Sequence, residues 1–355
     1  MKKLTDICDI QYGYAFDSAC FTEDSSYPPL VRIRDVKRGF SETYYSGEYP
    51  EEYVLHAGDL LVGMDGEFNI ARWKSIDALL NQRVCKLTAK EGTNEEYLRF
   101  AMVKVLKAIE DKTAFVTVKH LSAKELNKLE LDIPCIEEQN LRADSLSKLE
   151  KIISLHEEEL RLLDNLIKAR FVEMFGNPIE NEKGWDIAEL NSVCDGIGDG
   201  LHGTPEYDGN GSFPFINGNN LMNDVIEVTP TTKMVNESTY KKHFIELSNN
   251  AILLSINGTL GKLAFYNGED VMLGKSVCYC NLKPDINREF VYGVMKTDAF
   301  MSFLESNATA STIKNVGLKT IRGFKLILPP EELQIQFVIF SKQVDKSKVT
   351  VQKGY

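Results

Sequence analysis

The sequence predicts an α+β protein made of two similar domains, each of which is followed by a long helix. Three observations lead to this fold class. The same short motifs occur twice in the same order, strand-like runs separated by Gly, Asn and Asp fill both halves, and each half ends in a proline-led segment with helical apolar spacing. A chain of 355 residues is long enough for two domains of ordinary size.

The duplication rests on pairs of segments that share apolar positions more than identical letters. The two halves are therefore expected to share a fold and to differ on the surface. A repeat this long indicates a duplicated domain rather than a solenoid. The pairs are 4–9 with 190–195, 29–36 with 214–221, 58–66 with 250–258, 79–85 with 272–278, 117–121 with 312–316, and LELDIPCIEEQNL (129–141) with FKLILPPEELQIQ (324–336).

Each half is expected to form a curved, mainly antiparallel sheet with a helical stretch near its end. Helical stretches are predicted over 94–111 and 287–305. Asp65-Gly66 and Asn257-Gly258 are typical of hairpin turns. The predicted strands include PLVRIRDV (29–36), DLLVGM (59–64), AILLSI (251–256) and VCYCNL (277–282).

Residues 137–175 contain no Pro or Gly and predict one continuous helix with a heptad seam. A second apolar stripe on this helix implies packing on more than one neighbour. A shorter helix is expected from Glu331. The predicted seam residues, which we expect to pair the helices or dock a partner, are Leu146, Leu149, Ile153, Leu160, Leu163 and Ile167, and Leu333, Phe337, Phe340 and Val344. The expected boundaries are 1–133 and 178–328 for the domains, and 134–177 and 329–355 for the helices.

Composition places the chain among soluble globular proteins, with 43% hydrophobic and 26% charged residues. The net charge of −11 argues against a nucleic-acid partner when taken alone, but binding depends on local patches. We find no apolar run that could span a membrane and no signal peptide, and we expect a cytoplasmic protein. The seven cysteines lack ligand spacing with each other or with histidine, which predicts buried reduced thiols and no metal site.

Motifs for catalysis are missing or incomplete. Asn177-Pro178 lacks the second proline and the aromatic residue of an adenine methyltransferase motif. GIGDG (196–200) and GTLGK (258–262) do not have the spacing of dinucleotide or phosphate loops. No nucleophile elbow and no paired histidine ligands occur. The sequence therefore predicts no catalytic residues and favours recognition.

Basic and amide residues are the candidates for recognition. VRIRDVKRG (31–39) would place Arg32 and Arg34 on one face if it is a strand, and INGNNL (216–221) stands at the same place in the second half. Arg suits guanine and Asn suits adenine in the major groove, whereas a solvated strand edge and turn chemistry are the alternatives. The candidate DNA-binding residues are Arg32, Arg34, Lys37, Arg38, Arg72, Lys74, Arg83, Lys119, His120, His202, Thr204, Asn217, Asn219, Asn220, Lys262, Lys275, Lys314 and Asn315.

The duplicated order of these motifs resembles the DNA-specificity subunit of type I restriction–modification systems. The resemblance covers nearly the whole chain. It implies two target-recognition domains that each read one part of a split double-stranded DNA sequence, and two helices that pair as an antiparallel coiled coil. The segments that carry it are IPCIEEQ (133–139), LPPEELQIQ (328–336), GDLLVGMDG (58–66), NAILLSINGTLGK (250–262), and DGLHGTPEY (199–207) with PFING (214–218).

The resemblance also implies partners. The helices would dock two methyltransferase subunits, and an ATP-driven restriction subunit is a further candidate. S-adenosylmethionine, ATP and Mg would be bound by the partners, and this chain would bind none of them. Two features depart from the family pattern, namely Cys135 in place of a second proline and a second helix that ends earlier than the first. The alternative is a non-catalytic coiled-coil scaffold with two ligand- or peptide-binding domains.

Overall fold

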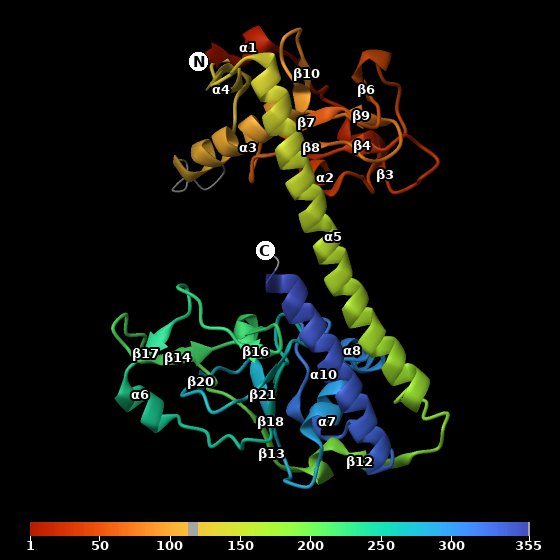
Figure 1. The fold of residues 1–355 in the computed structure, drawn as a ribbon, viewed down its shortest axis with the longest axis vertical. Helices are drawn as coiled ribbons and strands as arrows, with labels where there is room; N and C mark the ends of the chain where they lie inside the picture. The colour runs from red at the N-terminus through yellow and green to blue at the C-terminus, as the bar shows by residue number, and fades with distance from the viewer. Residues whose placement is uncertain (113–119, 354–355) are drawn as a thin grey trace. The chain divides into compact units, whose positions relative to one another are not determined.

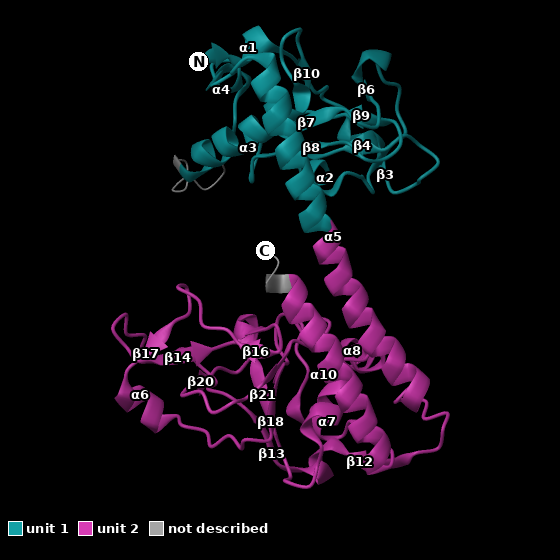
Figure 2. Cartoon of the chain, in the orientation of Figure 1, with its two compact units in different colours: residues 1–154 teal, residues 155–355 magenta. Residues whose placement is uncertain are grey.

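The computed structural model describes residues 1–112 and 120–353 and divides into two compact units, 1–154 and 155–355 (Figures 1 and 2). Each unit combines strands and helices, as the sequence predicts. The helix α5 (Ile136–Phe175) begins in unit 1 and ends in unit 2, so the predicted long helix is confirmed. Within the described residues, no helix combines the length and the apolar character needed to cross a membrane.

The main sheet of unit 1 has four strands, and every neighbouring pair is antiparallel. The helix α3 (Glu95–Lys112) buries Leu98, Met102 and Leu106 against this sheet, because residues four apart lie on one face of a helix. In sheet order, the strands are β2 (Cys8–Tyr12), β10 (Val84–Ala89), β7 (Leu60–Gly63) and β8 (Asn69–Arg72).

The other elements of unit 1 are short. The helices are α1 (Leu4–Ile7), α2 (Ile33–Arg38) and α4 (Ala123–Leu126). The strands pair as β1 (Lys2–Lys3) with β11 (Glu130–Leu131), β3 (Phe21–Thr22) with β5 (Tyr44–Tyr45), and β9 (Ala78–Leu80) between β4 (Leu30–Val31) and β6 (Val54–Leu55).

The main sheet of unit 2 repeats the order and the antiparallel pairing of unit 1. Each of its strands contains or borders the counterpart of a unit 1 segment, so the predicted duplication is confirmed at the level of topology. In sheet order, the strands are β13 (Cys194–Asp199), β21 (Val277–Leu282), β18 (Ala251–Ser255) and β19 (Leu263–Phe265).

The helical stretch predicted over 287–305 is two helices, α7 (Arg288–Met295) and α8 (Asp298–Ser306). The hydroxyl of Thr297 accepts a hydrogen bond from the backbone N–H of Phe300 and starts α8 as its cap. The other helices of unit 2 are α6 (Glu237–Lys242), α9 (Leu318–Arg322) and α10 (Glu331–Lys353). The remaining strands are β12 (Asp186–Glu189) with β22 (Lys325–Leu328), β15 (Leu221–Met222) with β16 (Val225–Ile226), and β14 (Phe213–Ile216) between β17 (Met234–Val235) and β20 (Met272–Leu273).

One strand prediction is wrong. The alternating letters of PLVRIRDV predicted a single strand, but the chain leaves β4 after Val31 and forms α2. The carboxylate of Asp35 accepts a 2.9 Å hydrogen bond from the backbone N–H of Arg32, which starts the helix. Gly39 ends it in the left-handed conformation, at a φ of 77°. Arg32 and Arg34 therefore do not share the face of a strand.

A glutamine near the start of each helix explains why the proline-led motif occurs twice. Gln139 Nε2 donates to the carbonyl oxygen of Pro134 at 2.9 Å, and Gln334 Nε2 donates to that of Pro329 at 2.8 Å. Each side chain folds back over the first turn of its helix and satisfies a proline carbonyl that lies between the strand and the helix. Gln139 is 1% exposed and also accepts from the backbone N–H of Asn94 at 2.9 Å. The motif is therefore a strand-to-helix connection that both units use.

Gln139→Ala is expected to lower the stability of unit 1 by about 2–4 kcal/mol, because it leaves buried backbone groups without partners. Asn140→Ala, which changes an exposed neighbour, is the matched control and should cost less than about 1 kcal/mol. Urea denaturation of the full chain, followed by hydrogen exchange of the unit 1 amides, measures both. Equal effects of the two variants would contradict the structural role of Gln139.

The second part of α5 and α10 pack antiparallel within unit 2. The ring of Phe171 meets that of Phe337 edge-on, with the centroids 5.3 Å apart. Farther along, Lys348 Nζ lies 2.6 Å from Asp164 Oδ1. Because residue numbers rise along one helix as they fall along the other, the two helices run in opposite directions. The predicted antiparallel pairing is confirmed for this part of α5.

The predicted seam residues fall into two groups. In unit 1, Leu146, Leu149 and Ile153 are 39%, 55% and 43% exposed. In unit 2, Leu160 is partly buried. The rest belong to the core of unit 2 or pack against it, namely Leu163, Ile167, Leu333, Phe337, Phe340 and Val344.

The seven cysteines are free thiols. Five are buried, Cys20 is half-buried and Cys135 is exposed. Burial raises the pKa of the Cys8 thiol to about 12, so this thiol stays protonated at neutral pH. The five buried thiols pack as small apolar side chains, as predicted, whereas the prediction of burial is wrong for Cys135.

Candidate nucleic-acid interface

Three segments that are far apart in the sequence meet beside the main sheet of unit 1. They are the turn after β7, the connection before β10 and the residues before α4. The backbone N–H of Met64 donates to Arg83 O at 2.9 Å, and that of Leu121 donates to Met64 O at 2.8 Å. Asp65 and His120 form an antiparallel bridge. We call this place the unit 1 junction (64–66, 81–83 and 120–121).

Unit 2 builds the same junction from 256–258, 274–276 and 315–316. The backbone N–H of Ile256 donates to Ser276 O at 3.0 Å, and that of Val316 donates to Ile256 O at 2.9 Å. Asn257 and Asn315 form the matching bridge. The backbone scaffold is thus repeated bond for bond. The polar side chains on it differ, because Asn257, Ser276 and Asn315 stand where unit 1 has Asp65, Arg83 and His120.

A glycine in each unit lets the junction approach the end of the first sheet strand. A Cβ atom on Gly13 would lie 2.0 Å from Asn81 O, and one on Gly200 would lie 2.1 Å from Leu273 O. Tyr14 N donates to Leu80 O at 2.9 Å, and its counterpart Leu201 N donates to Leu273 O at 2.8 Å. Only glycine permits backbones this close, so both units need it here.

The unit 1 junction carries an acid, a histidine and an arginine in contact. Asp65 Oδ1 is hydrogen-bonded to His120 Nδ1, and Arg83 Nη1 lies 3.2 Å from His120 Nε2. A neutral His120 can donate through Nδ1–H and accept from Arg83 through Nε2. Arg83 has a φ of 71°, which side-chain-bearing residues rarely adopt, so the junction backbone sets its direction. Its side chain is 50% exposed, and its Nε lies 3.6 Å from Asp65 Oδ2.

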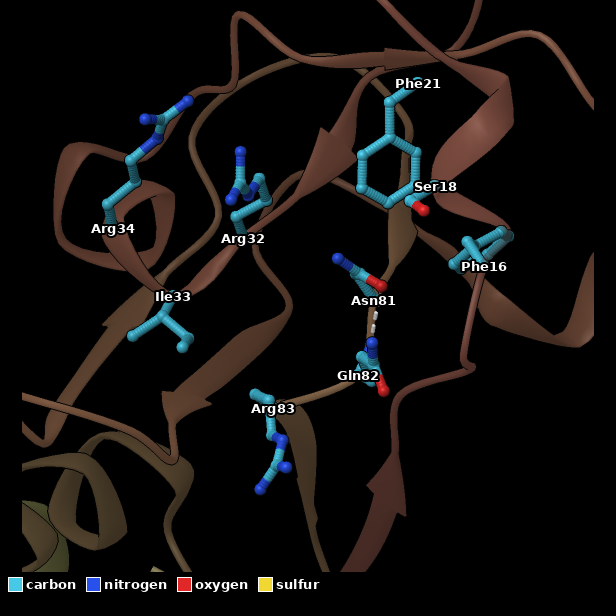
Figure 3. A pocket seen from close by; sticks show the side chains of 9 residues that line it. All are labelled: Phe16, Ser18, Phe21, Arg32, Ile33, Arg34, Asn81, Gln82 and Arg83. Carbon is cyan, nitrogen blue, oxygen red and sulfur yellow. Dashed lines mark hydrogen bonds between the residues drawn. The ribbon is translucent and has the colours of Figure 1, made fainter. Parts of the chain in front are cut away.

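A groove of about 440 Å³ opens between this junction and α2. In the view of Figure 3, Arg32 and Arg34 lie on one side, Phe16, Ser18 and Phe21 lie on the other, and the 81–83 connection lies between them. Amide, guanidinium and aromatic groups therefore line one open surface. The full lining is Phe16, Ser18, Phe21, Arg32, Ile33, Arg34, Asn81, Gln82 and Arg83.

The junction of unit 2 borders a hollow of about 430 Å³ with a different chemistry. Asn257 Nδ2 donates to Asn315 Oδ1 at 3.2 Å, and His202 Nε2 lies 2.8 Å from Asp199 Oδ2. Lys275 is exposed at its edge. The polar side chains of the unit 2 hollow are therefore two amides, a histidine, a carboxylate and one lysine, whereas three arginines line the unit 1 groove.

The asparagine run of unit 2 divides into structural and exposed residues. Asn220 Oδ1 accepts from the backbone N–H of Asn217, and its Nδ2 donates to Glu227 O and Thr232 Oγ1, each at 3.0 Å. This geometry favours the turn alternative for Asn220. Asn217 Oδ1 accepts from Ser276 Oγ at 3.1 Å, while Asn219 is exposed.

The other predicted residues lie outside the two hollows. Lys37 pairs with Glu67 at 3.2 Å, and Arg38 pairs with Glu42 at 2.8 Å and lies over the ring of Phe40. Lys119 falls outside the residues that the structure describes. Lys74, Thr204 and Lys314 are exposed, and Lys262 is half-buried.

Arg72 is engaged inside unit 1. Its guanidinium is hydrogen-bonded to the carboxylate of Glu96, and Nη1 lies 2.9 Å from Glu95 Oε1. Arg99 Nε in turn donates to Glu96 at 2.8 Å, and its Nη2 lies 2.6 Å from Glu150. The network joins β8, α3 and the start of α5. This geometry favours a structural role for Arg72.

Arg72→Ala is expected to cost about 1–3 kcal/mol of unit 1 stability, because charge-assisted hydrogen bonds are lost. Burial opposes ionisation of Glu96, but the hydrogen bonds from Arg99 and Arg72 prevail and hold its pKa below the ordinary value of 4.5. A carboxyl group whose pKa is lowered on folding stabilises the fold at pH values above its ordinary pKa. This contribution is lost as the pH falls through the pKa of the folded state. Denaturation at pH 7 and at successively lower pH below 4.5 measures both effects. If the difference in unfolding free energy between Arg72→Ala and wild type does not shrink as the pH falls, the proposed network is contradicted.

Several residues of the junctions and the two hollows are absent from the predicted site residues. The sequence identifies Asp65 and Asn257 only as hairpin turn residues, and it does not distinguish Asn81, Gln82 and Phe21 as site residues. The signal that could have found them is the alignment of the two halves. Asp65 aligns with Asn257 and His120 with Asn315, so chemically different residues occupy matched positions.

Comparisons with known proteins agree with the duplication. The family model of the type I restriction modification DNA specificity domain matches residues 1–165 and again 182–354. The specificity subunit of the type I restriction enzyme EcoBI of Escherichia coli is 27% identical over 364 aligned positions, which cover 94% of this chain and 77% of that protein.

Two solved structures share the fold. The S subunit of a type I restriction–modification system from M. genitalium has a TM-score of 0.53 at 14% identity, and the match covers 99% of this chain and 91% of that chain. A chain from a structure on assembly and conformational transition of the type I system has a TM-score of 0.50 at 17% identity, with the same coverage. With both of its halves matched by one family model, the chain belongs to the type I restriction-modification DNA specificity family.

Proposed function

We propose that this chain recognises a split double-stranded DNA target, with each unit reading one part through its junction and the adjoining hollow. One observation carries the proposal. The two units repeat the backbone hydrogen bonds of the junction but replace its side chains, Asp65 by Asn257 and His120 by Asn315. A preserved scaffold with exchanged polar groups is what two readers of different sequences require, because base edges are distinguished by donor and acceptor pattern.

The chemistry of each hollow suggests the bases. In unit 1, Arg32, Arg34 and Arg83 offer planar guanidinium donors, which suit the acceptor pair on guanine. In unit 2, Asn257 and Asn315 offer amides, which suit the acceptor and donor of adenine. Lys275 at the edge of the unit 2 hollow suits a phosphate contact, which positions without specifying.

The chain acts in this proposal without catalysis of its own. Two methyltransferase subunits would dock on the helices, and a restriction subunit is a further partner. S-adenosylmethionine, ATP and Mg would then be bound by those subunits in a cytoplasmic complex. The exposed residues Leu146 and Leu149 support a docked protein, since water-facing leucines in a helical stripe are costly to leave uncovered. Partner subunits would also supply phosphate contacts that a chain of net charge −11 does not.

Selection from random DNA tests the proposal. The full chain is assembled with its methyltransferase partner, bound to random duplexes at two salt concentrations, and the retained DNA is sequenced. The expected result is a motif of two short parts separated by a spacer of fixed length, with retention that falls steeply as salt rises. Retention of DNA without a split motif would overturn the proposal. Retention of no DNA at any salt would favour a scaffold that binds proteins or peptides.

A further inference from the structure

A carboxylate lies buried beneath the arginines of the unit 1 groove. Asp35 is 0% exposed, and its Oδ2 accepts the 2.9 Å hydrogen bond from the backbone N–H of Arg32 and lies 3.1 Å from Ser41 Oγ. Among the described residues, its Oδ1 accepts no hydrogen bond. Instead, Arg34 Nε lies 3.7 Å and Arg38 Nη1 lies 3.6 Å from Oδ1.

Unit 2 shows that a negative charge is not needed to cap this short helix. Asn220 occupies the position of Asp35 and makes the same cap, because its Oδ1 accepts from the backbone N–H of Asn217 at 3.0 Å. Its amide Nδ2 has hydrogen-bond acceptors in Glu227 and Thr232. In unit 2, the helix is capped by the neutral side chain of Asn220, and all of its polar atoms have partners. In unit 1, the helix is capped by the buried charge of Asp35, and one carboxylate oxygen accepts no hydrogen bond, although burying a charge is costly.

The charge has a second effect in unit 1. An anion in the protein interior attracts the two neighbouring guanidiniums more strongly than an exposed one would, because little water screens it. Arg34 is 59% exposed and would otherwise sample many rotamers in solvent. Asp35 touches both arginines on its side of the groove, Arg32 through the backbone and Arg34 through the guanidinium. Preorganised donors lose less entropy on binding and discriminate better between base edges.

We propose that Asp35 is a positioning residue for the unit 1 groove, which holds Arg32 and Arg34 in the arrangement that reads DNA. The proposal rests on the proposed function. The positioning role of Asp35 differs from a capping role. The cap survives replacement of the carboxylate by an amide, whereas the positioning of Arg34 is lost. Asp35 acts through the arginines and does not contact the DNA.

Asp35→Asn in the full chain assembled with its methyltransferase partner separates the two roles. The amide oxygen can cap as that of Asn220 does, but the amide nitrogen would face Arg34 and Arg38 without an acceptor. Thermal unfolding should therefore shift to a lower temperature while unit 1 stays folded at the temperature of the selection. Selection from random DNA should return the unit 2 part of the motif unchanged, while discrimination at the unit 1 part falls about tenfold. Total affinity for random duplex should not fall, because a negative charge has been removed from beneath a basic surface. Unchanged discrimination at both parts would overturn the proposal.

Arg34→Lys is the second variant, and it leaves Asp35 and its cap intact. A lysine keeps the positive charge but lacks the planar guanidinium that Asp35 orients. If Asp35 positions Arg34, then Arg34→Lys should lose as much discrimination at the unit 1 part as Arg34→Ala. Full discrimination by Arg34→Lys would overturn the proposal even if Asp35→Asn fails to fold. A wild-type complex that returns no split motif would instead overturn the proposed function.

Discussion

Phe337→Ala, a truncation on α10, should destabilise unit 2 by about 3–5 kcal/mol. Phe337 is 1% exposed and lies edge-on to Phe171 and Phe175, with centroids 5.3 and 5.8 Å away. A Cβ atom on Gly293 would lie 2.6 Å from its ring, so the ring rests directly on the backbone of α7. Truncation would leave a cavity that rigid helices on both sides cannot close.

Ile339→Ala is the matched control, because Ile339 lies on the same helix but is 54% exposed. It should change stability by less than about 1 kcal/mol. Urea denaturation of the full chain, with hydrogen exchange to separate the units, measures both variants. The loss should appear in unit 2 amides and leave those of unit 1 at wild-type protection. A Phe337→Ala variant as stable as Ile339→Ala would contradict the antiparallel packing of α5 and α10.

Much of the fold could be predicted because the two units obey the same backbone constraints. Gly13 and Gly200 are required because two backbone segments approach closely. Gln139 and Gln334 are required because each donates a hydrogen bond to a proline carbonyl just before its helix. Such constraints leave the same letters at matched positions even where surfaces diverge. The long helix was evident because nothing in 137–175 interrupts it.

Short elements could not be predicted because local contacts decide them. PLVRIRDV has the alternating pattern of a strand. A helix forms instead from Ile33, because the backbone N–H of Arg32 donates to the carboxylate of Asp35 and Gly39 ends the helix in the left-handed conformation. A helix of six residues is too short to show its own apolar period. The break between α7 and α8 depends in the same way on one cap, Thr297.

The candidate site was only partly predictable, because the sequence does not show which residues each arginine contacts in the fold. Arg83 and Arg72 look alike in the sequence, but Arg83 contacts Asp65 and His120 and stays half-exposed, whereas Glu95 and Glu96 bind the more buried Arg72. Asp65 looks like an ordinary turn residue until the strand pairing brings His120 beside it. Long-range pairing of this kind is set by the whole sheet and not by neighbouring letters.

Arg32→Ala with Arg34→Ala is expected to have the largest effect on recognition. Each lost bidentate contact to a base should cost about 1–3 kcal/mol of discrimination, and the loss should be confined to one part of the split target. The reason is that both arginines line the unit 1 groove, while unit 2 has its own hollow. Selection from random DNA by the assembled complex should show one part relaxed and the other intact.

The reciprocal variant is Asn257→Ala with Asn315→Ala, which should relax the other part of the target alone. Lys107→Ala with Lys128→Ala removes the same charge as the arginine pair from exposed sites outside the groove. It should weaken binding to all duplexes equally, if at all, and leave the motif unchanged. Equal degradation of both parts by either recognition variant would mean that the two hollows do not read separate sequences. If each recognition variant loses sequence preference at a different part of the target, the chain must contain two independent readers.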